Sequence, residues 1–95
     1  MKTKLYSKLA MDFFTEGTTD EILFTGLGSE AGEVLAERRK ECITGNQRTE
    51  QIRDELGDVL WYVNAIATSR GFTLKDLMSY NIAKLEYRLL NPKKL

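Results

Sequence analysis

The apolar positions of this chain recur three and four residues apart, which is the spacing of an α-helix, in four separate segments. The expected helices span residues 3–15, 20–42, 49–70 and 73–90. No segment alternates apolar and polar residues as a strand would, and the only proline, Pro92, follows the last segment. The pattern therefore predicts an all-α protein of four helices joined by short turns.

Turn and capping residues separate the four segments. The cluster Thr18-Thr19-Asp20 supplies an N-cap for the second expected helix. The turn Thr44-Gly45-Asn46 separates the second helix from the third, and Gly71 ends the third. Thr73 and Asp76 stand at the positions of a capping box in which Asp replaces the usual Glu or Gln.

Three glycines fall inside the second expected helix: Gly26, Gly28 and Gly32. Each weakens the helix by up to ~1 kcal/mol relative to alanine. Their presence predicts either a bend near the first two glycines or the close approach of another backbone.

Composition narrows the class of protein. With 95 residues, 42% of them apolar and 29% charged, the chain reads as one globular domain over residues 1–95. Fourteen basic residues balance fourteen acidic ones, so no overall positive field favours nucleic acid. Because the sequence shows no secretory leader and no apolar run that would span a membrane, a cytoplasmic protein is expected.

The absence of histidine restricts the possible chemistry. It excludes nucleophile systems that use a histidine base, and it excludes zinc held by imidazole. The single cysteine, Cys42, cannot form an intrachain disulfide. Any catalysis must therefore depend on carboxylates, lysine, tyrosine or a metal ion.

Two pairs of acidic residues stand three positions apart, Glu30 with Glu33 and Glu55 with Asp58, so each pair shares one helix face. The second pair borders an apolar stripe that is expected to form the core: Ile52, Leu56, Val59, Val63 and Ile66. If the two helices pack antiparallel, the four carboxylates converge at the rim of this core. Oxygen ligands without histidine or cysteine favour Mg²⁺ or Mn²⁺, with Ca²⁺ as another hard cation. On spacing alone, a metal site and a solvated surface are equal alternatives for these two pairs. Glu37 continues the stripe of the first pair and is expected to lie on the surface.

Two sequence strings extend these pairs into a longer motif, G-L-G-S-E-A-G-E-V over residues 26–34 and R-D-E-L-G-D-V-L over residues 53–60. They closely resemble the MazG-like nucleotide pyrophosphohydrolase family, in which an E-x-x-E pair is followed, after a variable linker, by an E-x-x-D pair. The resemblance covers residues 26–88. It implies an all-α, four-helix MazG-like bundle that is completed by assembly into a homodimer or a dimer of dimers.

The same resemblance implies a site for Mg²⁺, with Mn²⁺ as a possible substitute, held by Glu30, Glu33, Glu55 and Asp58. The implied reaction converts a nucleoside triphosphate, NTP or dNTP, to the monophosphate and pyrophosphate by attack of a metal-activated water. In a chain without histidine the proton of that water must pass to a carboxylate, and Glu30 and Glu33 are the candidates for this catalytic base.

Basic residues near the C-terminus extend the resemblance. An N-x-x-K motif followed by arginine matches Asn81, Lys84 and Arg88, which implies contacts to the phosphates or the sugar of the substrate. The alternative is a C-terminal helix whose cations favour its dipole and whose Asn81 caps a buried backbone group.

Aromatic residues supply candidates for contact with the nucleotide base. Tyr62 and Trp61 follow Asp58 by about one turn, and Tyr6, Phe13 and Phe14 are candidates for an opposite wall. Aromatic residues at helical spacing also occur in ordinary cores, so a structural role is the alternative for each.

Other functions compete with the pyrophosphohydrolase. A dimeric dUTPase or a phosphoribosyl-ATP pyrophosphohydrolase would use a similar acidic site. A non-catalytic helical interaction or scaffold module would retain the acidic motif without activity. Apolar residues outside the main stripes, including Phe24, Leu60 and Trp61, favour a homo-oligomer in every case.

Overall fold

The computed structural model describes residues 1–92 and contains four helices in that range. They are α1 (Thr3–Met11), α2 (Asp20–Thr44), α3 (Thr49–Ser69) and α4 (Leu74–Leu90). No strand occurs among these residues, so the prediction of an all-α fold is confirmed. Within the same range, no helix combines the length and the apolar composition needed to cross a membrane.

The helix ends depend on local hydrogen bonds that the sequence predicted in part. Thr19 caps α2 by accepting from the Ile22 backbone N–H at 3.3 Å. Thr73 and Asp76 form the predicted capping box at the start of α4, with both bonds between 3.0 and 3.1 Å. Gly71 adopts a φ of +83° after α3, which is the left-handed conformation expected of a helix-ending glycine.

Two predicted boundaries were wrong. The first helix ends at Met11 and not at Thr15, because the chain tightens there through i→i+3 bonds from Asp12 and Phe13, each 3.2 Å long. The hydroxyl of Thr18 then bonds the carbonyl of Thr15 at 2.7 Å and holds a turn where a helix was expected. The second helix runs two residues beyond Cys42 to Thr44, where Gly45 closes it with a φ of +75°.

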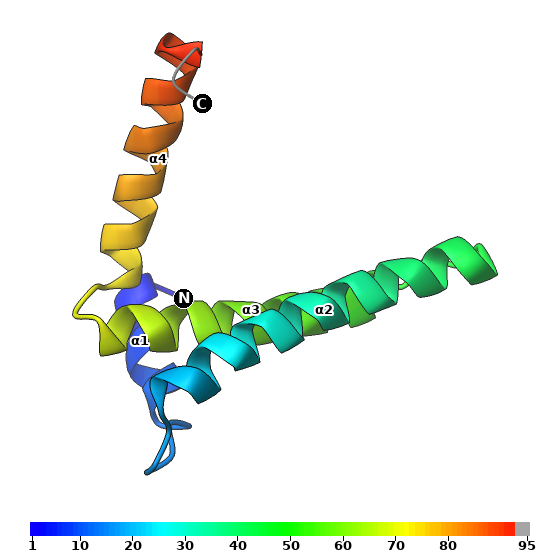
Figure 1. Ribbon diagram of the computed structural model, residues 1–95, viewed down its shortest axis with the longest axis horizontal. Coiled ribbons are helices and arrows are strands. Elements are labelled where there is room, and N and C mark those ends of the chain that lie inside the picture. Colours follow the sequence, from blue (N-terminus) through cyan, green and yellow to red (C-terminus); the bar gives the residue numbers. More distant parts are fainter. Residues whose placement is uncertain (93–95) are drawn as a thin grey trace.

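The helices α2 and α3 form a long antiparallel hairpin (Figure 1). Helix α1 packs against one end of this hairpin, and α4 projects from the same end. The radius of gyration is 16.0 Å, compared with about 13 Å for a compact chain of 100 residues. The single chain is therefore an open structure and not a closed four-helix bundle.

The hydrophobic core is small because the hairpin is only one layer thick. The buried apolar residues are Ala10, Leu23, Ala65, Ala67 and Leu74. Most of the predicted stripe on α3 is half-buried, but Leu56 is 51% exposed, so its prediction as a core residue was wrong. No helix of the described chain covers that side of α3.

Within residues 1–92, α4 contacts only α1 and α3, and its one buried residue is Leu74 in the first turn. From Met78 onward the apolar side chains of α4 are exposed to solvent, with exposed fractions between 48% and 81% for Met78, Ile82, Leu85 and Leu89. The helix consequently presents an uncovered apolar face.

Glu37 was predicted to be surface, and this was wrong, since it is only 6% exposed. Arg48, in the turn before α3, pairs with Glu37 through its Nε atom, and Lys40 pairs with the same carboxylate at 3.1 Å. The Arg48 backbone N–H also donates to Glu41 at 2.7 Å. These bonds close the far end of the hairpin, and the hydrogen bond from Arg48 is the main cause that lowers the pKa of Glu37.

At Gly26, the ring of Tyr62 from α3 packs against α2. The helix continues through Gly26 and Gly28 without a break, and the predicted close approach is made by the side chain of Tyr62 and not by a backbone. A methyl group placed on Gly26 would overlap this ring, with its Cζ at 2.5 Å and its hydroxyl at 2.8 Å. Glycine at this position lets the two helices pack.

Replacing Gly26 tests this contact. Gly26→Ala is expected to lower the free energy of unfolding by about 1–3 kcal/mol, because the clash outweighs the better helix propensity of alanine. The measurement is chemical denaturation of the full chain. Gly28→Ala is the matched control, since it meets nothing within 4 Å and should stabilise the protein by up to ~1 kcal/mol. Equal effects of the two changes would contradict the packing role of Gly26.

Candidate metal centre

Three carboxylates of the hairpin converge at its middle. Glu30 of α2 and Glu55 and Asp58 of α3 each offer one oxygen, and these oxygens lie within 4.8 Å of one another. Glu30 and Glu55 are half-buried and Asp58 is exposed. The two residues of α3 share a face because they are three positions apart, and the antiparallel packing brings Glu30 opposite them.

Glu33, the fourth predicted metal ligand, lies outside this trio. It is exposed one turn further along α2. Its charge nevertheless contributes to raising the pKa of Glu55, so it belongs to the same acidic surroundings. The predicted set of four is thus resolved into three convergent carboxylates and one neighbour.

The trio is electrostatically unfavourable by itself. Partial burial raises the pKa of Glu55, and the carboxylates of Asp58, Glu30, Glu33 and Asp54 raise it further. Every charged group that shifts this pKa is therefore an acid. A divalent cation would remove the repulsion, and three carboxylate oxygens match the ligand preference of Mg²⁺ and Mn²⁺. The residues present fit the predicted metal.

The two predicted aromatic residues have different surroundings. Tyr62 lies one turn beyond Asp58, with its ring over Gly26, at the edge of the trio. Trp61 faces α1 instead, where its Nε1 donates to the carbonyl of Ala10 at 2.9 Å. Its ring lies 6.4 Å from that of Phe14 and 5.0 Å from that of Tyr62. Trp61 therefore holds α1 in place, and Tyr62 is the aromatic residue beside the acidic site.

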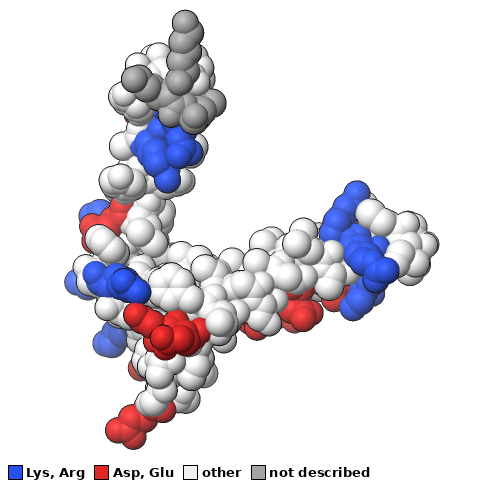
Figure 2. All heavy atoms as spheres, viewed as in Figure 1, with Lys and Arg blue, Asp and Glu red and all other residues white. Residues whose placement is uncertain are grey.

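The predicted phosphate-binding residues do not meet the trio within one chain. Asn81, Lys84 and Arg88 are all exposed on the projecting part of α4. Neither cation forms an ion pair within residues 1–92, although the Nζ of Lys84 lies 6.0 Å from the centre of the Tyr80 ring. Figure 2 shows basic side chains on α4 well apart from the acidic side chains beneath the hairpin.

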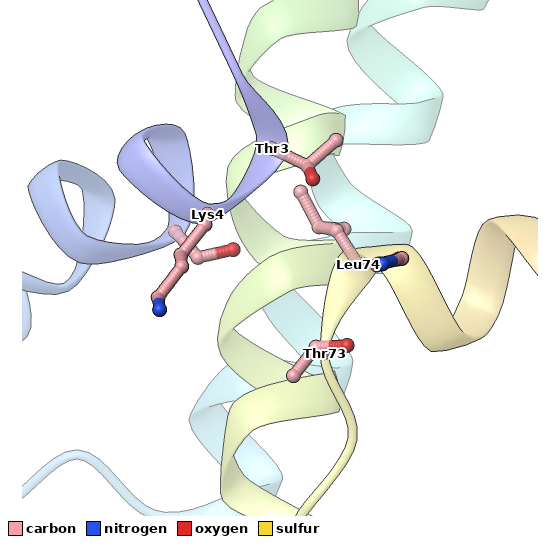
Figure 3. Close-up of a pocket in the computed structure, with 6 residues that line it drawn as sticks. Thr3, Lys4, Thr73 and Leu74 are labelled. Atoms are coloured by element: carbon pink, nitrogen blue, oxygen red, sulfur yellow. The ribbon is translucent and has the colours of Figure 1, made fainter.

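A cavity of about 200 Å³ lies elsewhere, at the junction of α1 and α4 (Figure 3). Its lining residues are Thr3, Lys4, Ser7, Thr73, Leu74 and Lys75. None of the three convergent carboxylates is among them, so this cavity is separate from the acidic trio.

Sequence reasoning missed two polar residues that shape this region. Asn64 is fully buried and accepts a hydrogen bond from Ser7 of α1 at 2.7 Å. Arg48 closes the hairpin through Glu37, eleven residues earlier in the chain. Neither pairing has a spacing signal, because each partner becomes a neighbour only after the helices pack.

Across the helical hairpin the three carboxylates form a group that could hold a metal ion. Residues 18–91 match the MazG nucleotide pyrophosphohydrolase domain, and the chain therefore belongs to that family. The matched range contains α2, α3 and α4, whereas α1 precedes it.

The chain is also similar to the Gene 37 protein of Mycobacterium phage L5, with 32% identity over 68 residues. The aligned residues are 66% of this chain and 60% of that phage protein, so the chain spans less than two thirds of its relative. No solved structure matches the chain.

The raised pKa of Glu55 predicts a pH-dependent loss of stability in the metal-free protein. An acid whose pKa is higher in the folded state disfavours folding once it is ionised. This cost develops as the pH rises from the ordinary glutamate pKa, about 4.3, towards the raised value, and it persists at neutral pH. Glu55→Gln is therefore expected to raise the melting temperature at pH 7, and this gain should disappear in acid.

The measurement is thermal unfolding in a chelating buffer across this pH range. Glu86→Gln, at an exposed position of α4, is the matched control and should leave the melting temperature unchanged. A lower melting temperature for Glu55→Gln at pH 7 would show that the carboxylate is stabilising instead.

Proposed function

We propose that this protein is a Mg²⁺-dependent nucleoside triphosphate pyrophosphohydrolase that converts an NTP or dNTP to the monophosphate and pyrophosphate. The observation that carries the proposal is the convergence of Glu30, Glu55 and Asp58 within 4.8 Å, inside the range that matches the family. Mn²⁺ is a possible substitute because it accepts the same oxygen ligands.

The acidic residues divide into two roles in this proposal. Glu30, Glu55 and Asp58 hold the cation, which supplies charge neutralisation at the phosphates and activation of water when it is bound. Glu33 lies beside the trio and is exposed, so it is the better placed of the two candidate bases to accept the proton of the attacking water. Tyr62, at the edge of the trio, is placed to contact the nucleotide.

A second copy of the chain would complete the site. The trio is surrounded by acids, whereas Lys84 and Arg88 project on α4 without a carboxylate partner in the described chain. The uncovered apolar face of α4 gives a second copy a surface to pack against. We therefore propose a homodimer or a dimer of dimers in which Asn81, Lys84 and Arg88 of one chain reach the triphosphate held by the acidic trio of another.

Release of pyrophosphate tests the activity. Wild-type protein with Mg²⁺ is expected to release pyrophosphate from at least one member of a panel of canonical and modified nucleoside triphosphates. Glu55→Gln should abolish the activity by removing a ligand. Glu33→Gln should slow it on the order of 10²–10⁴-fold, as expected for loss of a general base, while Mn²⁺ still binds.

Glu86→Gln serves as the control and should retain wild-type activity, because its side chain is exposed on α4 and lies outside the proposed site. If the wild type released no pyrophosphate from any triphosphate of the panel, the enzyme proposal would be refuted. A non-catalytic helical module would then be the better description.

Mixing two inactive variants tests whether the site is shared between chains. Glu55→Gln removes an acidic residue of the proposed shared site, and Lys84→Met removes a basic residue of it. In a dimer of one chain of each variant, one of the two sites is therefore intact. With random exchange of subunits, half of the dimers are mixed and the activity should return to about one quarter of wild type.

The control is a mixture of Glu55→Gln with Asp58→Asn, which damages the same side twice and should remain inactive. Failure of the first mixture to recover activity, in a sample that light scattering shows to exchange subunits, would place both halves of the site in one chain.

A further inference from the structure

We propose that Gly26 is a positioning residue for the cation site. Because it has no side chain, the ring of Tyr62 lies on α2 at this point, and the contact sets the spacing and register of α2 and α3 beside the acidic trio. The inference rests on the proposed function. It goes beyond the effect of Gly26 on stability, since it makes the affinity for the cation depend on a residue that carries no charge and binds no metal.

The contact lies one helical turn from the trio. On α2, Glu30 stands four residues after Gly26, and on α3, Asp58 stands four residues before Tyr62. The two helices are antiparallel, so both steps run in the same direction along the hairpin. Residues four apart also share a helix face. The glycine–tyrosine contact is therefore next to the place where Glu30 approaches Asp58, on the same side of the hairpin.

The contact leaves no room for a side chain on α2. A methyl group on Gly26 would lie 2.5 Å from Cζ and 2.8 Å from the hydroxyl oxygen of Tyr62. Nonbonded carbon atoms are best separated by about 3.5–4.0 Å, so the ring would have to move by about 1 Å. The ring also packs edge-on against Trp61, with 5.0 Å between their centroids, and Trp61 is hydrogen-bonded to Ala10. Because these neighbours restrict the ring, a side chain at position 26 would push the two helices apart.

The trio is sensitive to such a displacement because its members come from both helices. Glu30 belongs to α2, whereas Glu55 and Asp58 belong to α3, and their oxygens lie within 4.8 Å of one another. None of the ion pairs found within residues 1–92 involves these carboxylates, so the packing of the helices sets their separation. Groups that bind a ligand together must be held within about 0.5 Å of the productive geometry. A shift of about 1 Å between α2 and α3 would exceed this tolerance.

Titration with Mn²⁺ tests the proposal, with free Mn²⁺ measured by electron paramagnetic resonance at a temperature where circular dichroism shows the full chain to be folded. Gly26→Ala should weaken Mn²⁺ binding by about tenfold, which is the lower end of the loss seen when a group that supports metal ligands is changed. Gly28→Ala is the matched control. The same chemical change two residues along α2 meets nothing within 4 Å and should leave the affinity at the wild-type value.

A second control separates positioning from loss of stability. Leu74 is buried in α4 and lines the cavity that is separate from the trio. Leu74→Ala should lower the melting temperature, because it removes a buried side chain, but the folded protein should bind Mn²⁺ as the wild type does. A purely structural role of Gly26 would give Gly26→Ala the same pattern as Leu74→Ala.

A double variant shows whether Gly26 acts through the ring. Tyr62→Leu removes the ring from the contact and should itself weaken Mn²⁺ binding. In this background, Gly26→Ala should cause no further loss, because no ring remains to be displaced. This comparison does not require the single variant Gly26→Ala to fold.

The outcomes separate this inference from the proposed function. If the wild type and Gly26→Ala bind Mn²⁺ equally well, the role of Gly26 is overturned and the proposed metal site stands. A further tenfold loss on adding Gly26→Ala to Tyr62→Leu would also overturn it, since alanine would then act independently of the ring. If the wild type binds no Mn²⁺, both the metal site and the role of Gly26 are overturned.

Discussion

The packing of α2 against α3 holds mutually repelling carboxylates together, and the other features of the molecule depend on it. Partial burial raises the pKa of Glu55, the repulsion raises it further, and both disfavour the hairpin at its middle when Glu55 is ionised. The hairpin is fastened on both sides of this point. On one side the ring of Tyr62 lies over Gly26, and on the other Arg48 pairs with the buried Glu37. Contacts on both sides therefore hold together a cluster whose charges repel one another.

Features set by residues close in sequence were predictable. Helical periodicity, the capping box at Thr73 and the glycine that ends α2 need only a few neighbouring residues, and the structure confirms them. The same holds for the shared face of Glu55 and Asp58, which follows from a spacing of three. The family assignment is also confirmed, because residues 18–91, which include the acidic strings, match the family.

Features that depend on docking angles were not predictable. Leu56 belongs to an apolar stripe by spacing, yet no helix of the described chain covers it. Glu37 continues an acidic stripe and was expected in solvent, yet Arg48 reaches it from the turn before α3. The direction in which α4 leaves the hairpin has no signal in its own sequence, because only the contacts of its first turn determine it. Which predicted residues meet therefore depends on tertiary packing.

The thin core has a thermodynamic consequence. The heat capacity change of unfolding scales with the surface area that unfolding exposes. The denaturant dependence of the free energy of unfolding scales with the same area. A single chain whose buried apolar residues are three alanines and two leucines would unfold over a broad range of denaturant and with a shallow dependence on temperature. If a second copy covers the face of α4, folding and association become one equilibrium, and the melting temperature then rises with protein concentration.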